Sequence, residues 1–442
     1  MNEVGKVASS GGIMRKENQR TVNMAILALL MVINIFNFID RQLIASFSNY
    51  ILDDPDLNIT NKQFGFLTGI AFLFFYCLMG LFMGALADRT HRPRLLAAAV
   101  TLWSVLTAAT GMAKSFVGML IPRLFIGIGE SAATPTSISI LADRFPARHM
   151  GLVSGIYYLG VPVGVAASLL IVGYLGPLIG WRNCFYLIGG LGVGLAVLLL
   201  LIPETRQSRK IAAQAEPAVP LKDSLKDMWQ VFKASRSLQS IFLASVFFHV
   251  ILGAANFDQR WLVEERNFDR DEIAITAGWL AAAGGILGNL FGGFFGDLWQ
   301  AKLKTGRPMF LFWAFIIIAP ITIAYRFVSG DNPLIYLGIF MGFFQLGMFY
   351  GPSYATVQEL TPPHIRATMI AFFILTMNLL GLAFGATGAG IMIDVLIERG
   401  SNTPYSTTLI FFMFVSCLTA PMFYLSGKYF KTDKQKIFNE EG

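Results

Sequence analysis

The feature that most constrains this chain is a series of twelve long apolar segments. A helix needs about 20 mostly apolar residues to cross a bilayer. Lipid offers the backbone no hydrogen-bonding partner, so segments of this kind are expected to be helices. The sequence therefore predicts an all-α membrane protein with twelve transmembrane helices, at residues 22–46, 62–87, 93–113, 116–142, 150–175, 181–202, 237–263, 272–298, 307–327, 333–358, 363–395 and 405–430.

The basic residues are divided unevenly between the two sides that these helices define. With residue 1 on the inner side, 24 of the 34 Lys and Arg residues fall in inner segments, seven fall in outer loops and three lie inside helices. Lys and Arg concentrate on the cytoplasmic side of membrane proteins, so both termini are predicted to be cytoplasmic. The net charge of +7 then reflects membrane topology, and no nucleic-acid partner is expected.

Three short patterns recur in the two halves of the chain, in the same order and about 209 to 219 positions apart. They are Asn37–Arg41 with Asn256–Arg260, Gly84–Asp88 with Gly293–Asp297, and Pro135–Arg148 with Pro352–Arg366. Parallel repeats of this kind are typical of transporters that bind their substrate between two halves. The predicted organisation is a cytoplasmic tail (1–21), a six-helix bundle (22–202), a cytoplasmic linker (203–236), a second six-helix bundle (237–430) and a cytoplasmic tail (431–442).

The sequence lacks the patterns of several enzyme classes. No Gly-x-x-x-x-Gly-Lys-Ser/Thr loop, no Gly-x-Ser-x-Gly and no His-Glu-x-x-His occurs. The three Cys residues are scattered through apolar segments and have no metal-ligand spacing. We therefore expect neither an enzyme nor a cofactor or metal. A membrane-embedded enzyme and a non-transporting sensor remain the alternatives to a transporter, and a transport assay separates the sensor from it.

The loop that follows the second apolar segment, Gly84-Ala-Leu-Ala-Asp88-Arg89-Thr-His-Arg92-Pro-Arg94, resembles a signature of the major facilitator superfamily. Arg123-x-x-x-Gly127-x-Gly129 resembles a second signature, and Gly160-Val-Pro-Val-Gly164 is similar to a third, which is usually linked to antiporters. This resemblance covers essentially the whole chain. It implies two six-helix bundles that work by alternating access.

Within that superfamily the chain resembles the Spinster family. The residues that carry this likeness are Asp40-Arg41, Gly127-Ile-Gly-Glu-Ser131 and Tyr157-Tyr-Leu-Gly-Val-Pro-Val-Gly164. The resemblance implies a proton-coupled transporter of lysolipids or sphingolipid-like molecules. The anion:cation symporter family also carries an Asp-Arg pair in its first span and a run like Arg144–Arg148, so a proton-coupled symporter of small organic anions is the alternative.

Ionisable residues at membrane depth are costly, and they point to function by default. Asp40 lies about 18 residues, or ~27 Å, along the first apolar segment. Glu130 lies two turns from Arg123 on one helical face. Because both segments line the central cavity in this superfamily, we expect Asp40, Arg123 and Glu130 to face one another. We assign proton coupling to Asp40 and Glu130, and substrate binding or charge pairing to Arg41, Arg123, Asn37 and Arg260.

Each of these assignments has a structural alternative. For Asp40 and Arg41 the alternative is the interfacial end of the first helix, and for Glu130 it is a structural hydrogen bond between helices. Adjacent residues point about 100° apart on a helix, so Arg41 is expected to need a partner other than Asp40.

The resemblance also implies a gating latch at the inner end of the first bundle, made by Gly84, Asp88, Arg89, Arg92 and Arg144. A second, symmetry-related latch is predicted from Asp297, Glu359 and Arg366. The expected partners are protons, an amphipathic or lipid substrate and the surrounding membrane lipids, and the protein is expected to act as a monomer.

Overall fold

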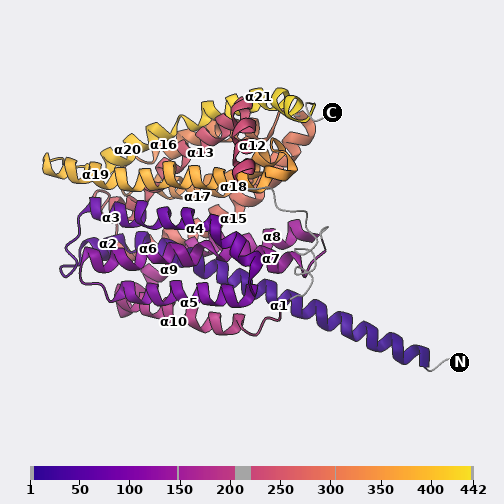
Figure 1. Ribbon diagram of the computed structural model, residues 1–442. Coiled ribbons are helices and arrows are strands. Elements are labelled where there is room, and N and C mark those ends of the chain that lie inside the picture. Colours follow the sequence, from indigo (N-terminus) through magenta and orange to yellow (C-terminus); the bar gives the residue numbers. More distant parts are fainter. Residues whose placement is uncertain (1–3, 147–148, 205–220, 304, 440–442) are drawn as a thin grey trace.

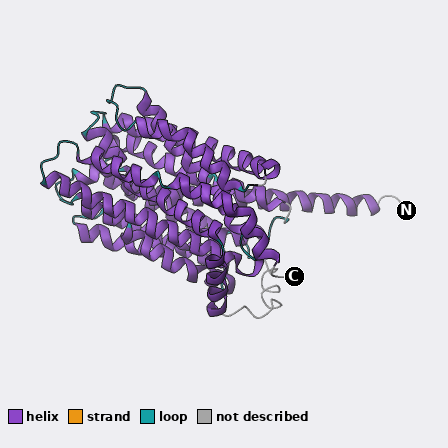
Figure 2. Cartoon of the chain, turned by 90° about the horizontal axis from the view of Figure 1, so that it is seen from above, coloured by secondary structure: helices purple, strands orange, loops and turns teal. Residues whose placement is uncertain are grey.

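The computed structural model describes residues 4–146, 149–204, 221–303 and 305–439. Within these residues every regular element is helical (Figure 2). Twelve helical segments are long and apolar enough to cross a membrane. The prediction of an all-α protein with twelve spans is therefore confirmed.

The first half of the chain forms six spans. Its helices are α1 (Val4–Ser46), α2 (Ser48–Leu52), α3 (Asn61–Thr68), α4 (Ile70–Arg89), α5 (Arg92–Gly111), α6 (Phe116–Ser131), α7 (Ala133–Ala142), α8 (Met150–Tyr158), α9 (Gly160–Ile179) and α10 (Trp181–Leu199).

The second half repeats this arrangement after helix α12 (Leu221–Ala234). Its elements are α13 (Arg236–Ala254), η2 (Ala255–Phe257), α14 (Asp258–Glu264), α15 (Arg270–Leu303), α16 (Arg307–Ala324), α17 (Leu334–Glu359), η3 (Pro363–Ile365), α18 (Arg366–Thr376), η4 (Met377–Ala383), α19 (Phe384–Glu398), α20 (Pro404–Ser416) and α21 (Thr419–Asn439).

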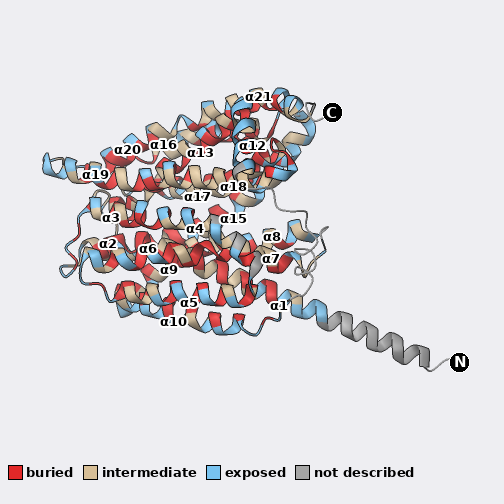
Figure 3. Ribbon diagram, in the orientation of Figure 1, coloured by how far each residue is buried: buried red, intermediate tan, exposed pale blue. Residues whose placement is uncertain are grey.

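The two halves form two layers of helices that lie against each other (Figure 1). Both ends of the described chain lie at the same end of the bundle, which we call the terminal face. The end that carries the α1–α3 and α19–α20 connections is called the opposite face. Large apolar side chains such as Leu178 and Ile317 are 77% and 71% exposed on the periphery, where a bilayer would cover them. Buried residues gather inside the layers (Figure 3).

The spans are interrupted at particular residues. The second predicted span breaks at Gly69, and Thr60 starts α3 with a capping box that it shares with Gln63. The eleventh span contains a π-helix, η4, over Met377–Ala383. Such turns are rare, and many occur at functional sites. This one contributes Asn378 and Leu382 to the central cavity described below.

Glycines bring the halves into close contact. A Cβ atom on Gly65 of α3 would lie 2.4 Å from the carbonyl oxygen of Ala386 in α19. A Cβ on Gly173 of α9 would lie 2.4 Å from the side chain of Ile275 in α15. Small residues permit this close approach of helices. The van der Waals packing that results contributes to helix association in lipid.

Hydrogen bonds and ion pairs between the halves cluster at the opposite face. Asp394 of α19 accepts hydrogen bonds from the backbone N–H of Asn61 and of Lys62, at the start of α3. Tyr50 donates to Asp271 at 2.6 Å, and Arg260 pairs with Asp53 at 2.7 Å. These contacts close the opposite face in the state that the structure describes.

The first segment of the chain differs from the sequence expectation. Helix α1 begins at Val4 and not at the first apolar residues, so the segment expected to be a polar tail continues the first span as a helix. The second part of the linker, where apolar residues recur at helical spacing, forms α12. Trp229 and Phe232 of α12 pack against Phe372 of α18, so the linker helix lies on the second bundle.

Candidate functional site

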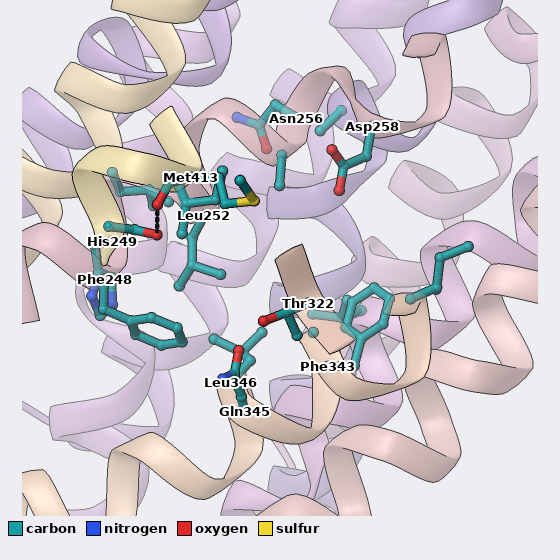
Figure 4. Close-up of a pocket in the computed structure, with 18 of the residues that line it drawn as sticks. Phe248, His249, Leu252, Asn256, Asp258, Thr322, Phe343, Gln345, Leu346 and Met413 are labelled. Atoms are coloured by element: carbon teal, nitrogen blue, oxygen red, sulfur yellow. Dashed lines mark hydrogen bonds between the residues drawn. The ribbon is translucent and has the colours of Figure 1, made fainter. Parts of the chain in front are cut away.

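A cavity of about 520 Å³ lies between the two halves and is lined by residues of both. Most of its lining side chains are apolar, and part of the wall is drawn in Figure 4. Among the residues that the structure describes, the charged side chains of the lining are Arg41 and Arg123 from the first half and Asp258 and Arg326 from the second. This volume falls in the range of small-molecule binding sites.

Arg41 provides the positive charge of the first wall. Its guanidinium donates to the Glu130 carboxylate from Nε at 3.2 Å and from Nη2 at 3.1 Å. The Arg41 side chain remains 19% exposed, whereas that of Glu130 is fully buried. The partner that Arg41 was expected to need is therefore Glu130.

Three aromatic rings surround the Arg41 guanidinium. Its Cζ atom lies 4.4 Å from the ring centroid of Tyr76, 4.8 Å from that of Phe38 and 5.3 Å from that of Phe72. A cation over aromatic faces is stabilised by the ring quadrupoles, more strongly where water is excluded. This aromatic cage fixes the direction in which Arg41 meets the cavity.

Arg123 was expected to face Asp40 and Glu130, but its hydrogen bonds go to other groups. It is 2% exposed, and its Nη2 donates to the backbone carbonyl of Arg41 at 2.9 Å. Its guanidinium also lies over Phe72, with Cζ 4.4 Å from the centroid. No ion pair joins Arg123 to Asp40 or Glu130 among the described contacts. Arg123 therefore holds the backbone of α1 at Arg41 instead of pairing with a carboxylate.

Asp40 points away from the cavity, toward α5. Its carboxyl group makes a short hydrogen bond with the hydroxyl of Thr107, and the residue is 3% exposed. The same hydroxyl lies 2.9 Å from the carbonyl oxygen of Trp103. Asp40 is thus buried within the first bundle and does not mark an interfacial helix end. Thr107 was not singled out in the sequence, where nothing distinguishes it from the other threonines of that span.

Asn37 lies one turn before Arg41 on α1 and interacts with the Glu130 carboxyl group. Its Nδ2 atom and the Glu130 Oε1 atom are both buried without a partner at normal hydrogen-bond distance. The structure therefore brings Asn37, Arg41 and Glu130 together, as grouped in the sequence, and adds the aromatic cage.

Arg260, the repeat counterpart of Arg41, does not line the cavity. Its Nη2 pairs with Asp53 of the other half at 2.7 Å and with Glu264 at 3.0 Å. Arg260 is a charge-pair residue that ties the halves together at the opposite face. Arg41 and Arg260 therefore have different roles, although they occupy the same position in the repeated sequence pattern.

The second wall contains an ion pair that sequence reasoning missed. Arg326 pairs with Asp258 at 2.8 Å, and its guanidinium lies 4.6 Å from the ring centroids of both Trp261 and Tyr325. Arg326 lies at the outer end of the ninth predicted span, where a charged side chain can reach the aqueous phase. A signal was available, because Asp258 belongs to the repeat of the Asp40 region.

His249 adds a polar group to the same wall (Figure 4). Its Nδ1 lies 2.8 Å from the carbonyl oxygen of Ser245. A carbonyl only accepts, so Nδ1 carries the hydrogen of the ring. The Nε2 atom is buried and has no partner among the described groups.

The first predicted latch takes shape around Arg92 at the terminal face. Arg92 donates to Glu204 at 2.6 Å and to Asp143 at 2.5 Å. Arg144 donates to the carbonyl of Pro203. These five residues all precede α12, so this cluster fixes the end of the first bundle. The surroundings of Gly84 and the side chains of Asp88 and Arg89 lie outside the described part of the structure.

The second predicted latch is built around a different arginine. Arg307 donates to Asp297 at 2.8 Å and also pairs with Glu359, which accepts from Lys434 at 3.1 Å. Arg366 instead donates to the carbonyl of Thr361 at 3.4 Å. Arg307 begins the ninth span as Arg92 begins the third, and Glu359 ends the tenth as Asp143 ends the fourth. The internal repeat therefore extends to these two clusters.

Comparisons with known proteins agree with this architecture. The chain is 28% identical over 386 residues to an "MFS-type efflux pump" of Mycolicibacterium smegmatis, and the alignment covers 85% of each protein. It is 24% identical over 391 residues to "Protein spinster" of Drosophila melanogaster, and that alignment covers 86% of this chain and 64% of the other protein.

Among solved structures, a bacterial homologue of the human lysosomal transporter Spinster, in an inward-facing and unoccupied conformation, superposes with a TM-score of 0.77. The two are 22% identical, and the match covers 93% of this chain and 98% of that one. At this identity the likeness shows the fold. The resemblance to Spinster proteins that the motifs predict is thus confirmed as a resemblance.

The Major Facilitator Superfamily pattern matches residues 30–386, which is most of the chain. The twelve-helix fold, the cavity between two halves and this match lead to the same conclusion. The protein is an integral, multi-pass membrane transporter and not an enzyme, and it belongs to the Major Facilitator Superfamily.

Proposed function

We propose that the chain is a proton-coupled secondary transporter whose substrate is an amphipathic molecule with an anionic group. The observation that carries this proposal is Arg41, which faces the cavity from an aromatic cage while its counter-ion, Glu130, is fully buried behind it. The cavity therefore presents a cation to an incoming molecule. The remaining wall is mostly apolar, which suits a hydrocarbon chain better than a sugar.

Arg41 can bind a second anion while it keeps its contact with Glu130. Removing the partner of a buried charge costs several kcal/mol, so Arg41 needs an anion throughout the cycle. Glu130 supplies it in the empty cavity, at 3.1 Å. A phosphate or carboxylate that enters the cavity can share the guanidinium, because Arg presents five N–H donors in a planar fork.

Asp40 is the proposed proton carrier. The Thr107 hydroxyl contacts both the Asp40 carboxyl group and the Trp103 carbonyl, and a hydroxyl has only one hydrogen to donate. Threonines in helices commonly donate to the carbonyl one turn earlier. If Thr107 does so, the hydrogen between Asp40 and Thr107 belongs to Asp40, which is then protonated. An ionised Asp40 would instead take the Thr107 hydrogen and leave Trp103 without it.

Proton binding at Asp40 and anion binding at Arg41 are linked through the backbone of α1. Asp40 and Arg41 are neighbours, and Arg123 binds the Arg41 carbonyl at 2.9 Å. A change in the contact between Asp40 and α5 therefore alters the placement of Arg41 in the cavity. We propose that proton release from Asp40 and substrate release from Arg41 occur together as the halves rock.

The proposed orientation places the terminal face in the cytoplasm, because that side carries most of the Lys and Arg residues. In this orientation the contacts at the opposite face close the outer side of the molecule in the state described here. The protein is proposed to act as a monomer among membrane lipids.

Uptake into proteoliposomes under an imposed proton gradient tests this function. Three labelled probes would be compared: a lysophosphatidic acid, a sugar acid and a short dicarboxylate. Wild type is expected to accumulate the lysophosphatidic acid. Arg41→Gln should reduce its uptake at least about tenfold, because the anionic group loses its partner. Asp331→Asn, an exposed loop residue, serves as the matched control and should transport like wild type.

Two results would contradict the proposal. Accumulation of the sugar acid or the dicarboxylate alone would assign the chain to small organic anions instead. Undiminished lysophosphatidic acid uptake by Arg41→Gln would remove the role of Arg41.

A further inference from the structure

Helix α12 is packed against the second bundle along one side only. Figure 1 shows it running across the direction of the spans, near the terminal face. Met228 on its inner side is 5% exposed. The ring centroid of Phe232 lies 5.0 Å from that of Phe242 in α13 and 5.6 Å from that of Phe372 in α18. The remaining sides of α12 are free to meet the surroundings of the protein.

Hydrogen bonds at the junction with α13 fix the direction in which these sides point. Gln239 of α13 donates to the carbonyl of Phe232 at 3.0 Å and to that of Lys233 at 2.9 Å, in the last turn of α12. Ser235, between the two helices, donates to the buried Asp433 of α21 at 3.0 Å. The last turn of α12 is therefore tied to the ends of two spans, which is the level of the lipid headgroups.

At this level α12 exposes apolar and basic side chains next to each other. Leu225 and Trp229 lie one turn apart, and each is 44% exposed. Lys226 and Lys233 are exposed too, and the Lys233 Nζ atom lies 5.3 Å from the ring centroid of Trp229. Neither lysine forms an ion pair with a carboxylate among the residues that the structure describes. We call these four residues the lysine–tryptophan face.

The charges of α12 are graded around its axis. By helix geometry Lys233 and Lys226 lie about 40° and 60° from Trp229. Asp223 and Asp227 lie further round in the same direction, at about 120° and 160°. The Asp227 carboxylate is also 3.9 Å from the histidine ring of η3. The order is therefore apolar, basic and then acidic, which is the order expected for a helix whose apolar edge faces lipid and whose acidic edge faces water.

We propose that the lysine–tryptophan face binds the headgroups of anionic phospholipids in the adjoining leaflet. Leu225 and Trp229 enter the interfacial layer of the bilayer, where tryptophan is favoured. The two ammonium groups then meet the phosphates of the headgroups. A basic residue near an anionic membrane surface strengthens binding about fivefold. This inference is independent of the transported substrate, because the face lies outside the central cavity.

Two other roles for this face make different predictions. A helix that only braces the second bundle has no preference between lipids. A site for an acidic soluble protein needs the lysines but keeps Trp229 away from acyl chains. The quantity to measure is therefore the preference of the surroundings of Trp229 for anionic over zwitterionic lipid.

The experiment uses the full chain in phosphatidylcholine vesicles that contain a minor fraction of brominated lipid. The brominated lipid is either phosphatidylglycerol or phosphatidylcholine, with identical chains brominated near the headgroup. Bromine quenches tryptophan fluorescence on contact, and subtraction of the same protein with Trp229→Phe isolates the signal of Trp229. The test variant combines Lys226→Gln with Lys233→Gln. The matched control combines Lys62→Gln with Lys114→Gln, two exposed lysines in loops of the opposite face.

In wild type, half-maximal quenching of Trp229 should need about fivefold less brominated phosphatidylglycerol than brominated phosphatidylcholine. The variant without Lys226 and Lys233 should bring this ratio to about one. Its quenching by phosphatidylcholine should stay as in wild type, which shows that α12 remains in place. The control variant should keep the wild-type ratio, and 1 M salt should lower the ratio in wild type because it screens the headgroup charges.

Two results would overturn the proposal. Equal quenching by the two lipids in wild type, or a ratio that survives the loss of both lysines, would remove the preference for anionic headgroups. Absence of Trp229 quenching by either lipid would show that the lysine–tryptophan face lies outside the bilayer.

Discussion

The carboxylate of Asp394 joins the two halves at the opposite face, and its replacement by asparagine should shift the balance between conformations. Asp394 accepts from the backbone N–H of Asn61 at 3.1 Å, from the side-chain amide of Asn61 at 2.9 Å and from the backbone N–H of Lys62 at 2.8 Å. The two backbone donors belong to the first turn of α3, where helix N–H groups have no partner within the helix. A carboxylate of one half thus caps a helix of the other.

The size of the effect follows from these bonds. Hydrogen bonds to a charged group contribute about 1.5–3 kcal/mol each, and a negative charge at a helix N-terminus adds about 0.3–1 kcal/mol. Asparagine keeps one oxygen acceptor but loses the charge and places an NH₂ group against a donor. We take the net loss for Asp394→Asn as about 2 kcal/mol. That figure corresponds to roughly a 30-fold change in the ratio of the closed to the open opposite face.

Double electron–electron resonance measures this ratio directly. Spin labels at Lys62→Cys and Asn402→Cys, both exposed on the opposite face, report whether the halves separate there, with the three native cysteines replaced. Lys62→Cys keeps the backbone N–H that Asp394 binds. Asp394→Asn should populate a longer distance that wild type shows weakly or not at all.

The matched control is Glu398→Gln, which removes one charge from the same helix one turn further on, at an exposed position. It should leave the distance distribution unchanged. A shift of less than about twofold in Asp394→Asn, or an equal shift in Glu398→Gln, would refute the reasoning that this cap holds the opposite face closed.

Three further predictions concern other parts of the molecule. Thr107→Val keeps the shape of the side chain but removes the hydroxyl that contacts Asp40, so it should lower proton-driven uptake at least about tenfold while substrate exchange without a gradient persists. Gly65→Ala would place a methyl group 2.4 Å from the Ala386 carbonyl, and it should therefore open the opposite face in the same resonance assay, whereas Gly80→Ala, where no atom lies nearby, should not. At Asp54, burial raises the carboxyl pKa, but hydrogen bonds from Arg182 and Trp181 outweigh this effect and hold the pKa below its ordinary value. The stability that this carboxylate contributes is present above the ordinary pKa of about 3.9 and is lost as the pH falls through the lowered pKa. The melting temperatures of wild type and Asp54→Asn should therefore differ at pH 7 and converge in acid.

The fold was predictable because it depends on properties that a single sequence displays directly. The bilayer fixes the length and hydrophobicity of each span, and the repeat between Asn37–Arg41 and Asn256–Arg260 revealed the two halves. The helix breaks were less accessible. Gly69 interrupts the second span, but glycine is common in membrane helices and most of its occurrences leave the helix intact.

The site was predictable in its members and not in its pairings. Asp40, Arg123 and Glu130 are buried and Arg41 is partly exposed to the cavity, and the four lie near one another, as the cost of charge in a membrane predicts. Which of them pair depends on how each helix is rotated about its axis. Asp40 and Arg41 point about 100° apart on α1, so the rotation of α1 decides which of them faces Glu130 on α6. A single sequence does not specify helix rotation that finely.

Partners that are polar without being charged were missed for a related reason. Thr107 looks like an ordinary member of its helix until Asp40 of the neighbouring helix is in place. Asp258 and Arg326 lie near the ends of spans, where charged residues commonly reach the aqueous phase. Only the assembled bundle shows that they face the cavity.

The most direct test of the central claim is to record proton and substrate movement together, in vesicles that contain a pH-sensitive dye and no imposed gradient. Addition of a lysophosphatidic acid to wild-type vesicles should produce a pH change inside them that follows uptake of the lipid. Asp40→Asn, which keeps the shape of the side chain but does not titrate, should still bind and exchange the lipid without any pH change. A pH change in Asp40→Asn equal to that of wild type would contradict the assignment of Asp40 as the proton carrier, and lipid movement in wild type without protons would contradict proton coupling itself.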